Sequence, residues 1–328
     1  MNKKDLKVVV IGGGTGSFTL LKSLKDHTKY ITALVNMSDD GGSTGILRDE
    51  LGVLPPGDVR QCLVALSNAP QIRDLFNYRF EEGTFEGHAF GNLFMAALEK
   101  MTGDFTEGVE LASQILNITG KVEPVILNSV QLCMNSGGEP NIKGEYKIAH
   151  AIFNSSKPQL WLEPEPRVNP EAVTSIMNAD LVVIAPGNLY GSLAPALIVP
   201  EIGTALEQAK AKLMFVCNLV TKPGQTDGFK VHMYAEEVER FIGHQSLDYV
   251  LYNTAKPSDE LLSKYAADGE YGVEADQAAL AAAHYDAIGA DLLGEIFKTS
   301  KADFIKRTLI RHDSEKVAAE IMRIAHAK

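Results

Sequence analysis

The chain has 328 residues, of which 45% are hydrophobic and 22% are charged, and its formal net charge is -11. This composition is typical of a globular protein with a large apolar core, and the acidic balance disfavours a nucleic-acid-binding surface. No apolar run is long enough to cross a membrane and no signal peptide is visible, so we expect a cytoplasmic protein with no membrane contact. Cys62, Cys133 and Cys217 lie far apart in apolar contexts, which indicates core residues rather than disulfides or a metal site.

Residues 7–45 predict a strand, a glycine turn, a helix, a second strand and a polar loop. The apolar runs Lys7–Ile11 and Ile31–Met37 suit strands that helices cover on both faces. The turn after the first run contains Gly12, Gly13, Gly14, Thr15 and Gly16. Such glycines let the backbone approach a ligand, and the helix that follows, which Thr15 or Ser17 could cap, would offer its N–H groups to a phosphate. The alternative is a tight turn that only serves close helix packing.

The glycine spacing matches neither of the common nucleotide-binding motifs. It departs from the dinucleotide fingerprint because position 17 is serine, and no Lys-Ser/Thr pair follows as in a P-loop. NAD(P)-dependent redox chemistry is therefore disfavoured.

The loop after the second strand, Ser38–Gly45, contains Asp39, Asp40 and Ser43. Asp39 and Asp40 are candidate catalytic residues and could hold Mg2+ or bond a ribose hydroxyl. Adjacent aspartates in a glycine loop are also common turn formers and helix caps, so this alternative stays open.

Two further residues stand out before position 100. Asp58 is the expected N-cap of a helix over residues 59–66, which places Arg60 in the first turn. Arginine is unfavourable there, so either an anionic ligand or a salt bridge to Asp39, Asp40, Asp49 or Asp58 would explain it. His88 lies between glycines before a helix at 93–100 that Asn92 could cap. It could contact a ligand or carry a proton, or simply bond a loop carbonyl.

The α/β pattern is interrupted once. Residues 121–168 contain short apolar segments separated by polar turns, including 125–127, 130–134, 146–148 and 160–162, which predict an inserted antiparallel β subdomain or flap. Residues 1–120 and 169–328 then form the two parts of one α/β domain with a doubly wound, mostly parallel sheet. Helix starts are expected at Asn169–Glu171 and after Asp313.

Polar residues follow three strands expected at 181–184, 213–217 and 249–252; they are Asn188, Ser192, Asn218 and Asn253. Open parallel sheets bind ligands at the carboxyl ends of their strands, so five separate loops should converge on one site. These four side chains can bond a base or a sugar. None is paired with a general base, so the sequence does not indicate covalent catalysis.

Five motifs in order carry a family resemblance: Ile11–Gly16, Ser38–Gly45, Pro55–Arg60, Gly87–Asn92 and Ala185–Tyr190. Together they resemble the bacterial gluconeogenesis factor family, which is related to the 2-phospho-L-lactate transferase of deazaflavin-cofactor biosynthesis. The resemblance implies a Rossmann-like fold and binding of UDP-sugars such as UDP-N-acetylglucosamine. It also implies a role in cell shape and wall-precursor supply during gluconeogenic growth. The sequence leaves open whether this role passes through contact with an enzyme of amino-sugar synthesis. Arg311 resembles an arginine that would reach the nucleotide diphosphate; the alternative is a surface residue in a capping turn.

Two functions from different classes remain open. One is a nucleotide-sugar sensor that requires no cofactor, and the other is a Mg2+-dependent transferase of phosphorus-containing groups or nucleotides. Both predict binding of a nucleotide diphosphate, and turnover separates them. The sequence leaves the oligomeric state open, a homo-oligomer included.

Overall fold

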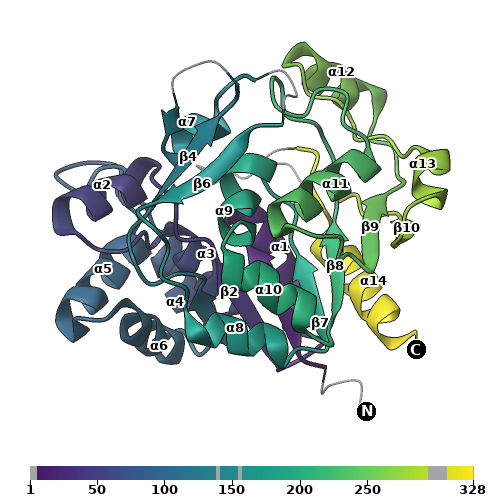
Figure 1. Cartoon of the computed structure of the whole chain (residues 1–328). Coiled ribbons are helices and arrows are strands. Elements are labelled where there is room, and N and C mark those ends of the chain that lie inside the picture. The colour runs from purple at the N-terminus through teal and green to yellow at the C-terminus, as the bar shows by residue number, and fades with distance from the viewer. Residues whose placement is uncertain (1–5, 138–140, 154–156, 295–308, 328) are drawn as a thin grey trace.

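The computed structural model describes residues 6–137, 141–153, 157–294 and 309–327. These residues contain a parallel sheet of seven strands in the order β10-β9-β8-β7-β1-β2-β3 (Figure 1). The strands are β1 (Val8–Gly12), β2 (Ile31–Val35), β3 (Lys121–Pro124), β7 (Leu181–Ile184), β8 (Lys212–Val216), β9 (Tyr249–Asn253) and β10 (Asp286–Ala290). Because the order runs outward from β1 on both sides, the sheet is doubly wound and the predicted Rossmann-like α/β class is confirmed.

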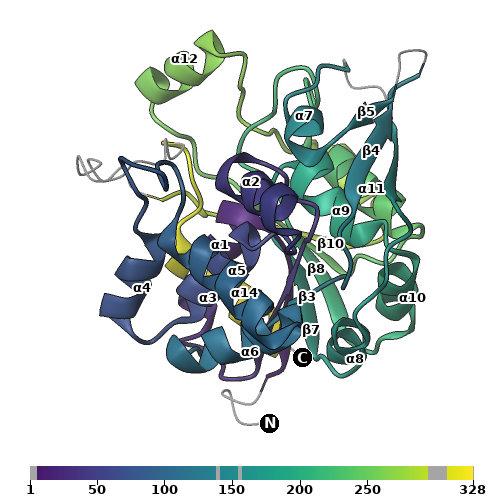
Figure 2. The same cartoon turned by 90° about the vertical axis from the view of Figure 1, so that its left-hand side faces the viewer.

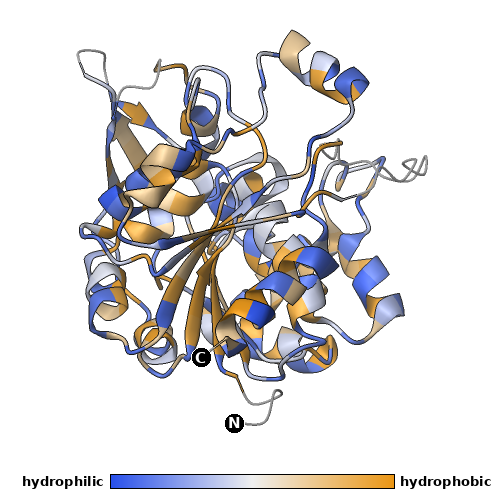
Figure 3. Cartoon of the chain, turned by 90° about the vertical axis from the view of Figure 1, so that its right-hand side faces the viewer, coloured by the Kyte–Doolittle hydropathy of each residue, from blue (hydrophilic) through white to orange (hydrophobic). Residues whose placement is uncertain are grey.

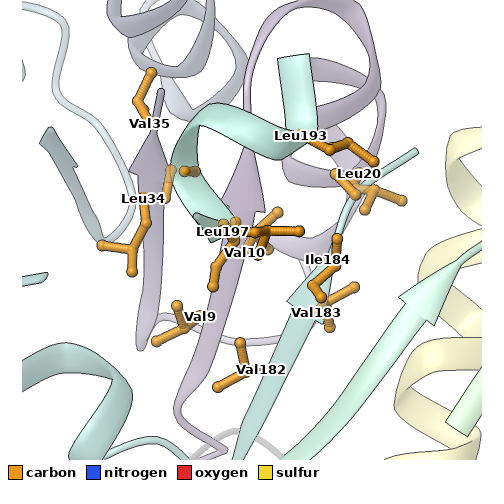
Figure 4. Packing of buried hydrophobic residues seen from close by; sticks show 14 of the residues in the cluster. Val9, Val10, Leu20, Leu34, Val35, Val182, Val183, Ile184, Leu193 and Leu197 are labelled. Carbon is orange, nitrogen blue, oxygen red and sulfur yellow. The ribbon is translucent and has the colours of Figure 1, made fainter. Parts of the chain in front are cut away.

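The centre of the core lies where β1 pairs with β2 and β7. Val10 is in register with Ala33 on one side and with Val183 on the other, and all three side chains are buried. Apolar residues from both covering layers, such as Leu20 and Leu197, pack against these strands (Figure 4). The strands are apolar along their length while the outer helices carry polar stretches (Figure 3), as expected of a parallel sheet that helices cover on both faces.

Helices cover the two faces of the sheet and its carboxyl edge. One face carries α1 (Gly14–Leu24), α3 (Gly57–Leu66) and α14 (Ser314–His326), with α4 (Pro70–Asn77), α5 (Phe90–Thr102) and α6 (Phe105–Ile115) outside them. The other carries α8 (Pro170–Met177), α9 (Ala194–Leu197), α10 (Pro200–Gln208) and α11 (Val231–Ile242). Figure 2 shows α2 (Gly42–Leu51) and α12 (Asp259–Ala267) toward the carboxyl edge. Of two further short helices, the π-helix η1 (Leu189–Leu193) follows β7, and α13 (Gln277–Ala281) precedes β10.

The predicted β insertion is present as a second, antiparallel sheet. It consists of β5 (Ile142–Lys143), β4 (Gln131–Asn135) and β6 (Gln159–Glu163), with the short helix α7 (Glu145–Ala149). An antiparallel bridge between Ile126 and Val168 joins its two ends. Two details differ from the prediction. Residues 121–124 form β3 and pair with β2 in the main sheet, and the apolar segment 146–148 is helical. The polar stretch 154–158, which the sequence predicts as one of the turns between these segments, lies partly outside the described residues.

Helix starts were predicted with mixed success. The side chains of Asn169 and Asp313 cap α8 and α14 as expected. Asp58 and Asn92 are not N-caps, because α3 begins at Gly57 and α5 at Phe90, so both residues lie inside the first turn. Over the described ranges, no single helix is long and apolar enough to cross a membrane; the bent pair Leu189–Leu197 and Pro200–Gln208 passes that test by length and composition only.

Candidate functional site

The strand order reverses between β1 and β7, so their carboxyl ends form the crevice where open α/β sheets bind ligands. The glycine turn follows β1 there. Gly14 has a φ of +59°, which favours glycine. A Cβ at Gly16 would overlap the carbonyl oxygen of Pro186 in the loop after β7, so only glycine lets α1 approach that loop. The turn therefore has the packing role that the sequence left open as its alternative to phosphate binding.

The N-terminus of α1 already has an anionic partner. The prediction that Thr15 or Ser17 caps the helix is wrong: both lie within it, and neither makes a capping bond. Instead the Asp58 carboxylate accepts a hydrogen bond from the backbone N–H of Gly14. This acceptor comes from α3, more than 40 positions along the chain, and it lies where a phosphate would be expected. A phosphate reaching this turn would have to displace the carboxylate or bind through a cation that neutralises it.

Asp58 belongs to a carboxylate cluster that we define as Asp39, Asp40, Asp58 and Glu145. Burial raises the pKa of Asp58 to about 7, and the charge of Asp39 adds to the effect. Burial likewise raises the pKa of Glu145 to about 8, with contributions from the other three carboxylates, and raises that of Asp39. Negative charge is thus unfavourable here, and a bound cation would relieve it.

Within the cluster, Asp39 and Asp40 also make local bonds. The Asp39 carboxylate accepts the backbone N–H of Gly41 at 3.0 Å and the hydroxyl of Thr44. Asp40 accepts the backbone N–H of Tyr146 at 2.8 Å, which ties the loop after β2 to the first turn of α7. Both aspartates therefore form turns or caps, which is the alternative to metal or ribose binding that the sequence left open. In the described ranges no group of three His, Cys, Asp or Glu residues is already arranged to hold a metal ion, so Mg2+ would require these oxygen ligands to rearrange.

The four polar residues after β7, β8 and β9 differ in how much of their side chain remains available. Ser192 lies in η1 and is half-buried. Asn188 accepts the backbone N–H groups of Tyr190 and Gly191 and so caps η1. Asn253 bonds the backbone of its own loop and accepts from Leu292. By contrast, the Asn218 amide donates to the Gly187 carbonyl at 2.8 Å while its Oδ1 is buried without a partner. Asn218 thus retains an unused acceptor, unlike Asn188 and Asn253, but a ligand would reach this buried oxygen only after neighbouring side chains move.

Arg60 lies beneath the crevice rather than in it. It is 7% exposed and donates to Asn92 Oδ1 at 2.8 Å and to Asn77 Oδ1 at 2.9 Å. No salt bridge joins it to any of the four aspartates in the described residues, so that expectation is wrong. Ser43, expected in a loop, is the second residue of α2 and its Oγ lies 2.9 Å from Nδ1 of His88. The structure thus contains a serine–histidine contact that the sequence did not indicate.

A cavity of about 830 Å³ opens at the carboxyl end of β9, under α12. Its lining includes Asn253, Lys256, Tyr271, Gln277 and Ile310, and its volume is typical of small-molecule sites. Arg311, next to Ile310, is half-buried, and its guanidinium makes no hydrogen bond or ion pair with the described part of the chain. A half-buried cation without a partner is available to an anionic ligand.

Comparison with known proteins settles the family. Residues 8–293 match the family model described as 2-phospho-L-lactate transferase CofD. The chain belongs to the CofD family. Among its relatives, proteins named "Putative gluconeogenesis factor" from Thermotoga maritima (39% identity; 98% of this chain, 99% of the relative) and "Gluconeogenesis factor" from Bacillus subtilis (37%; 95% and 96%) are similar over nearly their full length. A crystal structure of a UPF0052-family protein from Bacillus halodurans has a TM-score of 0.87 at 36% identity, covering 97% of this chain and 99% of that one.

In this member of the CofD family, sequence reasoning missed three residues of the site region: Asp58 as part of the cluster, Glu145 and Asn92. The motif Pro55–Arg60 contained Asp58, so the resemblance did carry a signal for it. Glu145 had none, because the insertion brings it to the crevice from 100 positions away along the chain. Asn92 was read as a helix cap, and only the fold reveals its bond to Arg60.

Proposed function

We propose that this protein binds a UDP-sugar such as UDP-N-acetylglucosamine across the carboxyl edge of its sheet. The observation that carries the proposal is the cavity at β9, which lies on the same edge of the sheet as the point between β1 and β7 where the strand order reverses. Three strand spacings separate β1 from β9, which is about 14 Å. A base, ribose, diphosphate and sugar in sequence form a ligand long enough to reach both.

Each part of such a ligand has a chemical counterpart along the edge. The cavity at β9 would take the nucleoside, with Tyr271 as an aromatic wall. Arg311 would bond the diphosphate, because a guanidinium matches phosphate oxygens in a bidentate manner. Oδ1 of Asn218 and the half-buried hydroxyl of Ser192 would bond the sugar at the β7–β8 end of the crevice.

In the cell, we propose that ligand binding regulates the supply of wall precursors, and with it cell shape, during growth on gluconeogenic carbon sources. The names of the relatives support a role in gluconeogenesis. The protein would act as a sensor through contact with an enzyme of amino-sugar synthesis.

The alternative is a Mg2+-dependent transferase of a phosphorus-containing group or a nucleotide, as the family model's description suggests. The carboxylate cluster favours it, because Asp39, Asp40 and Asp58 provide the hard oxygen ligands that Mg2+ prefers. When bound, Mg2+ would neutralise phosphate charge during transfer. These carboxylates would hold the cation after the rearrangement that its coordination requires.

Calorimetric titration with UDP-N-acetylglucosamine tests the binding proposal. Arg311→Gln should weaken binding at least tenfold, because it removes a charge-assisted contact with the diphosphate. Arg323→Gln is the matched control: Arg323 lies on α14, exposed and paired with Glu320, and its loss should change affinity less than twofold. Equal affinities of wild type and Arg311→Gln would refute the assigned binding mode. Release of GMP, UMP or pyrophosphate above an Asp39→Asn control would move the conclusion to the transferase.

A further inference from the structure

A chain of hydrogen bonds runs from the buried Arg60 to the partly exposed His88. Arg60 Nε donates to Asn92 Oδ1 at 2.8 Å, and Asn92 Nδ2 lies 3.2 Å from Ser43 Oγ. Ser43 Oγ in turn lies 2.9 Å from His88 Nδ1. The four residues come from α3, α5, α2 and the loop before α5, so only the folded chain brings them together.

The guanidinium fixes the direction of the first two bonds in this chain, and the absence of another acceptor for Ser43 among the described residues gives the third. Guanidinium nitrogens only donate, so the oxygen of Asn92 must face Arg60 and its NH2 group must face Ser43. Ser43 Oγ then accepts from Asn92, and the only other partner of this hydroxyl among the described residues is Nδ1 of His88, so its hydrogen is donated to that nitrogen. A neutral imidazole that accepts at Nδ1 carries its proton on Nε2. Burial lowers the pKa of Arg60 only to about 10, so Arg60 remains charged and keeps this direction at neutral pH.

The free end of the chain is an N–H donor with Arg79 in its own loop, and with Asp39 and Asp40 in the loop that leads to Ser43. Nε2 of His88 bonds nothing in the described part of the molecule, and the ring is partly exposed. Arg79, in the same loop, donates to the Gly87 carbonyl next to His88. Ser43 lies at the start of α2, whose first N–H groups favour an anion. An N–H donor in this setting suits a phosphate or carboxylate oxygen.

We propose that Arg60, Asn92 and Ser43 are positioning residues that hold His88 in the Nε2–H tautomer, so that it donates a hydrogen bond to a phosphate-type oxygen of the ligand. This contact is separate from the diphosphate contact that the proposed function assigns to Arg311, because Ser43 and His88 lie after β2 and before α5. The tautomer itself is a property of the free protein. It explains why a charged arginine is buried in the first turn of α3, where the helix dipole disfavours it.

The test is the nitrogen spectrum of 15N-histidine protein at a pH where the ring is neutral, with His88→Gln to identify the signals. Wild type should show a protonated Nε2 and an unprotonated Nδ1. Asn92→Asp should exchange the two: a carboxylate accepts from both Arg60 and Ser43, so Ser43 must then accept from Nδ1–H. Asn77→Asp is the matched control, because Asn77 also accepts from Arg60 but does not contact Ser43; it should leave the tautomer unchanged. Ser43→Ala, which removes the donor to Nδ1, should abolish the fixed tautomer and serves if Asn92→Asp does not fold.

Inorganic pyrophosphate is the probe for the ligand contact. It should shift the Nε2 signal of wild type and of Asn77→Asp, and bind Asn92→Asp about tenfold more weakly, the effect of losing one charge-assisted bond. A wild-type Nδ1–H tautomer, or an unchanged tautomer in a folded Asn92→Asp, would overturn the relay. An Nε2 signal that pyrophosphate does not move would overturn the ligand contact. If pyrophosphate shifts Nε2 while UDP-N-acetylglucosamine does not bind, the relay stands and the proposed function fails.

Discussion

Asp58→Asn should stabilise the free protein, and more so at high pH than at low pH. Burial and the charge of Asp39 raise the pKa of Asp58 from 3.8 to about 7. The folded protein therefore binds this proton more tightly than the unfolded chain does. Between pH 3.8 and about 7 the folded state holds more protons, so the free energy of unfolding falls as pH rises through this window. Above about pH 7 the carboxylate is ionised in both the folded and the unfolded state. The folded protein then carries the whole free-energy penalty of a buried, ionised Asp58.

The size of the effect follows from the two pKa values. At 1.36 kcal/mol per pKa unit, Asp58 costs the folded state about 4 kcal/mol at pH 8, where it is ionised, and about 2 kcal/mol at pH 5.5, where it must take up a proton that the unfolded chain releases. Asparagine removes the charge and keeps an oxygen to accept the N–H of Gly14. The stability advantage of Asp58→Asn over wild type should therefore grow by about 2 kcal/mol between these two pH values.

Urea unfolding in metal-free buffer at both pH values measures this difference. Asp49→Asn is the control, since Asp49 is an exposed aspartate of α2 that pairs with Arg48; its effect should be nearly the same at both pH values. An advantage of Asp58→Asn that does not change with pH would refute the reasoning, because it would mean that the surroundings of Asp58 do not favour its protonated form.

Three other outcomes are expected. Gly16→Ala should lower the free energy of unfolding in urea by at least 2 kcal/mol more than Gly14→Ala does. A Cβ at Gly16 overlaps the Pro186 carbonyl, whereas a Cβ at Gly14 has space and meets only backbone strain. Similar losses in the two variants would contradict the close contact between α1 and the loop after β7. Asp40→Ala should cost about 1 kcal/mol and speed proteolysis within the insertion, because it removes the cap of α7; unchanged proteolysis would contradict this link. Mg2+ should raise the melting temperature of wild type at pH 8 more than that of Asp39→Asn, and equal shifts would place the cation elsewhere.

The sheet could be predicted because its signals are local. Apolar runs such as Lys7–Ile11 and 181–184 have no polar face, which in a chain with alternating helices favours parallel strands. The convergence of polar loops at one edge follows from that topology alone. Short or weakly apolar segments gave poorer predictions. Residues 146–148 could be a strand or a helix by periodicity, and β10 (Asp286–Ala290) is too rich in small residues to stand out.

The details of the site could not be predicted because they depend on contacts between distant residues. That Asp58 bonds Gly14 rather than its own helix is set by how α3 packs beside α1. The surroundings of Arg60 depend equally on α5, which supplies Asn92. Sequence reasoning recognised that this arginine needed a partner and offered anions, whereas the fold provides two asparagine side chains. Which polar atoms remain free, such as Oδ1 of Asn218, emerges only once the backbone partners are known.

The most direct test of the central claim is calorimetric titration of the purified protein with UDP-N-acetylglucosamine, GDP and NADPH, each with and without Mg2+. The account predicts saturable binding of the UDP-sugar, weaker binding of GDP and none of NADPH. Preference for GDP with an absolute requirement for Mg2+ would contradict the sensor and support the transferase. Binding of NADPH alone would contradict both.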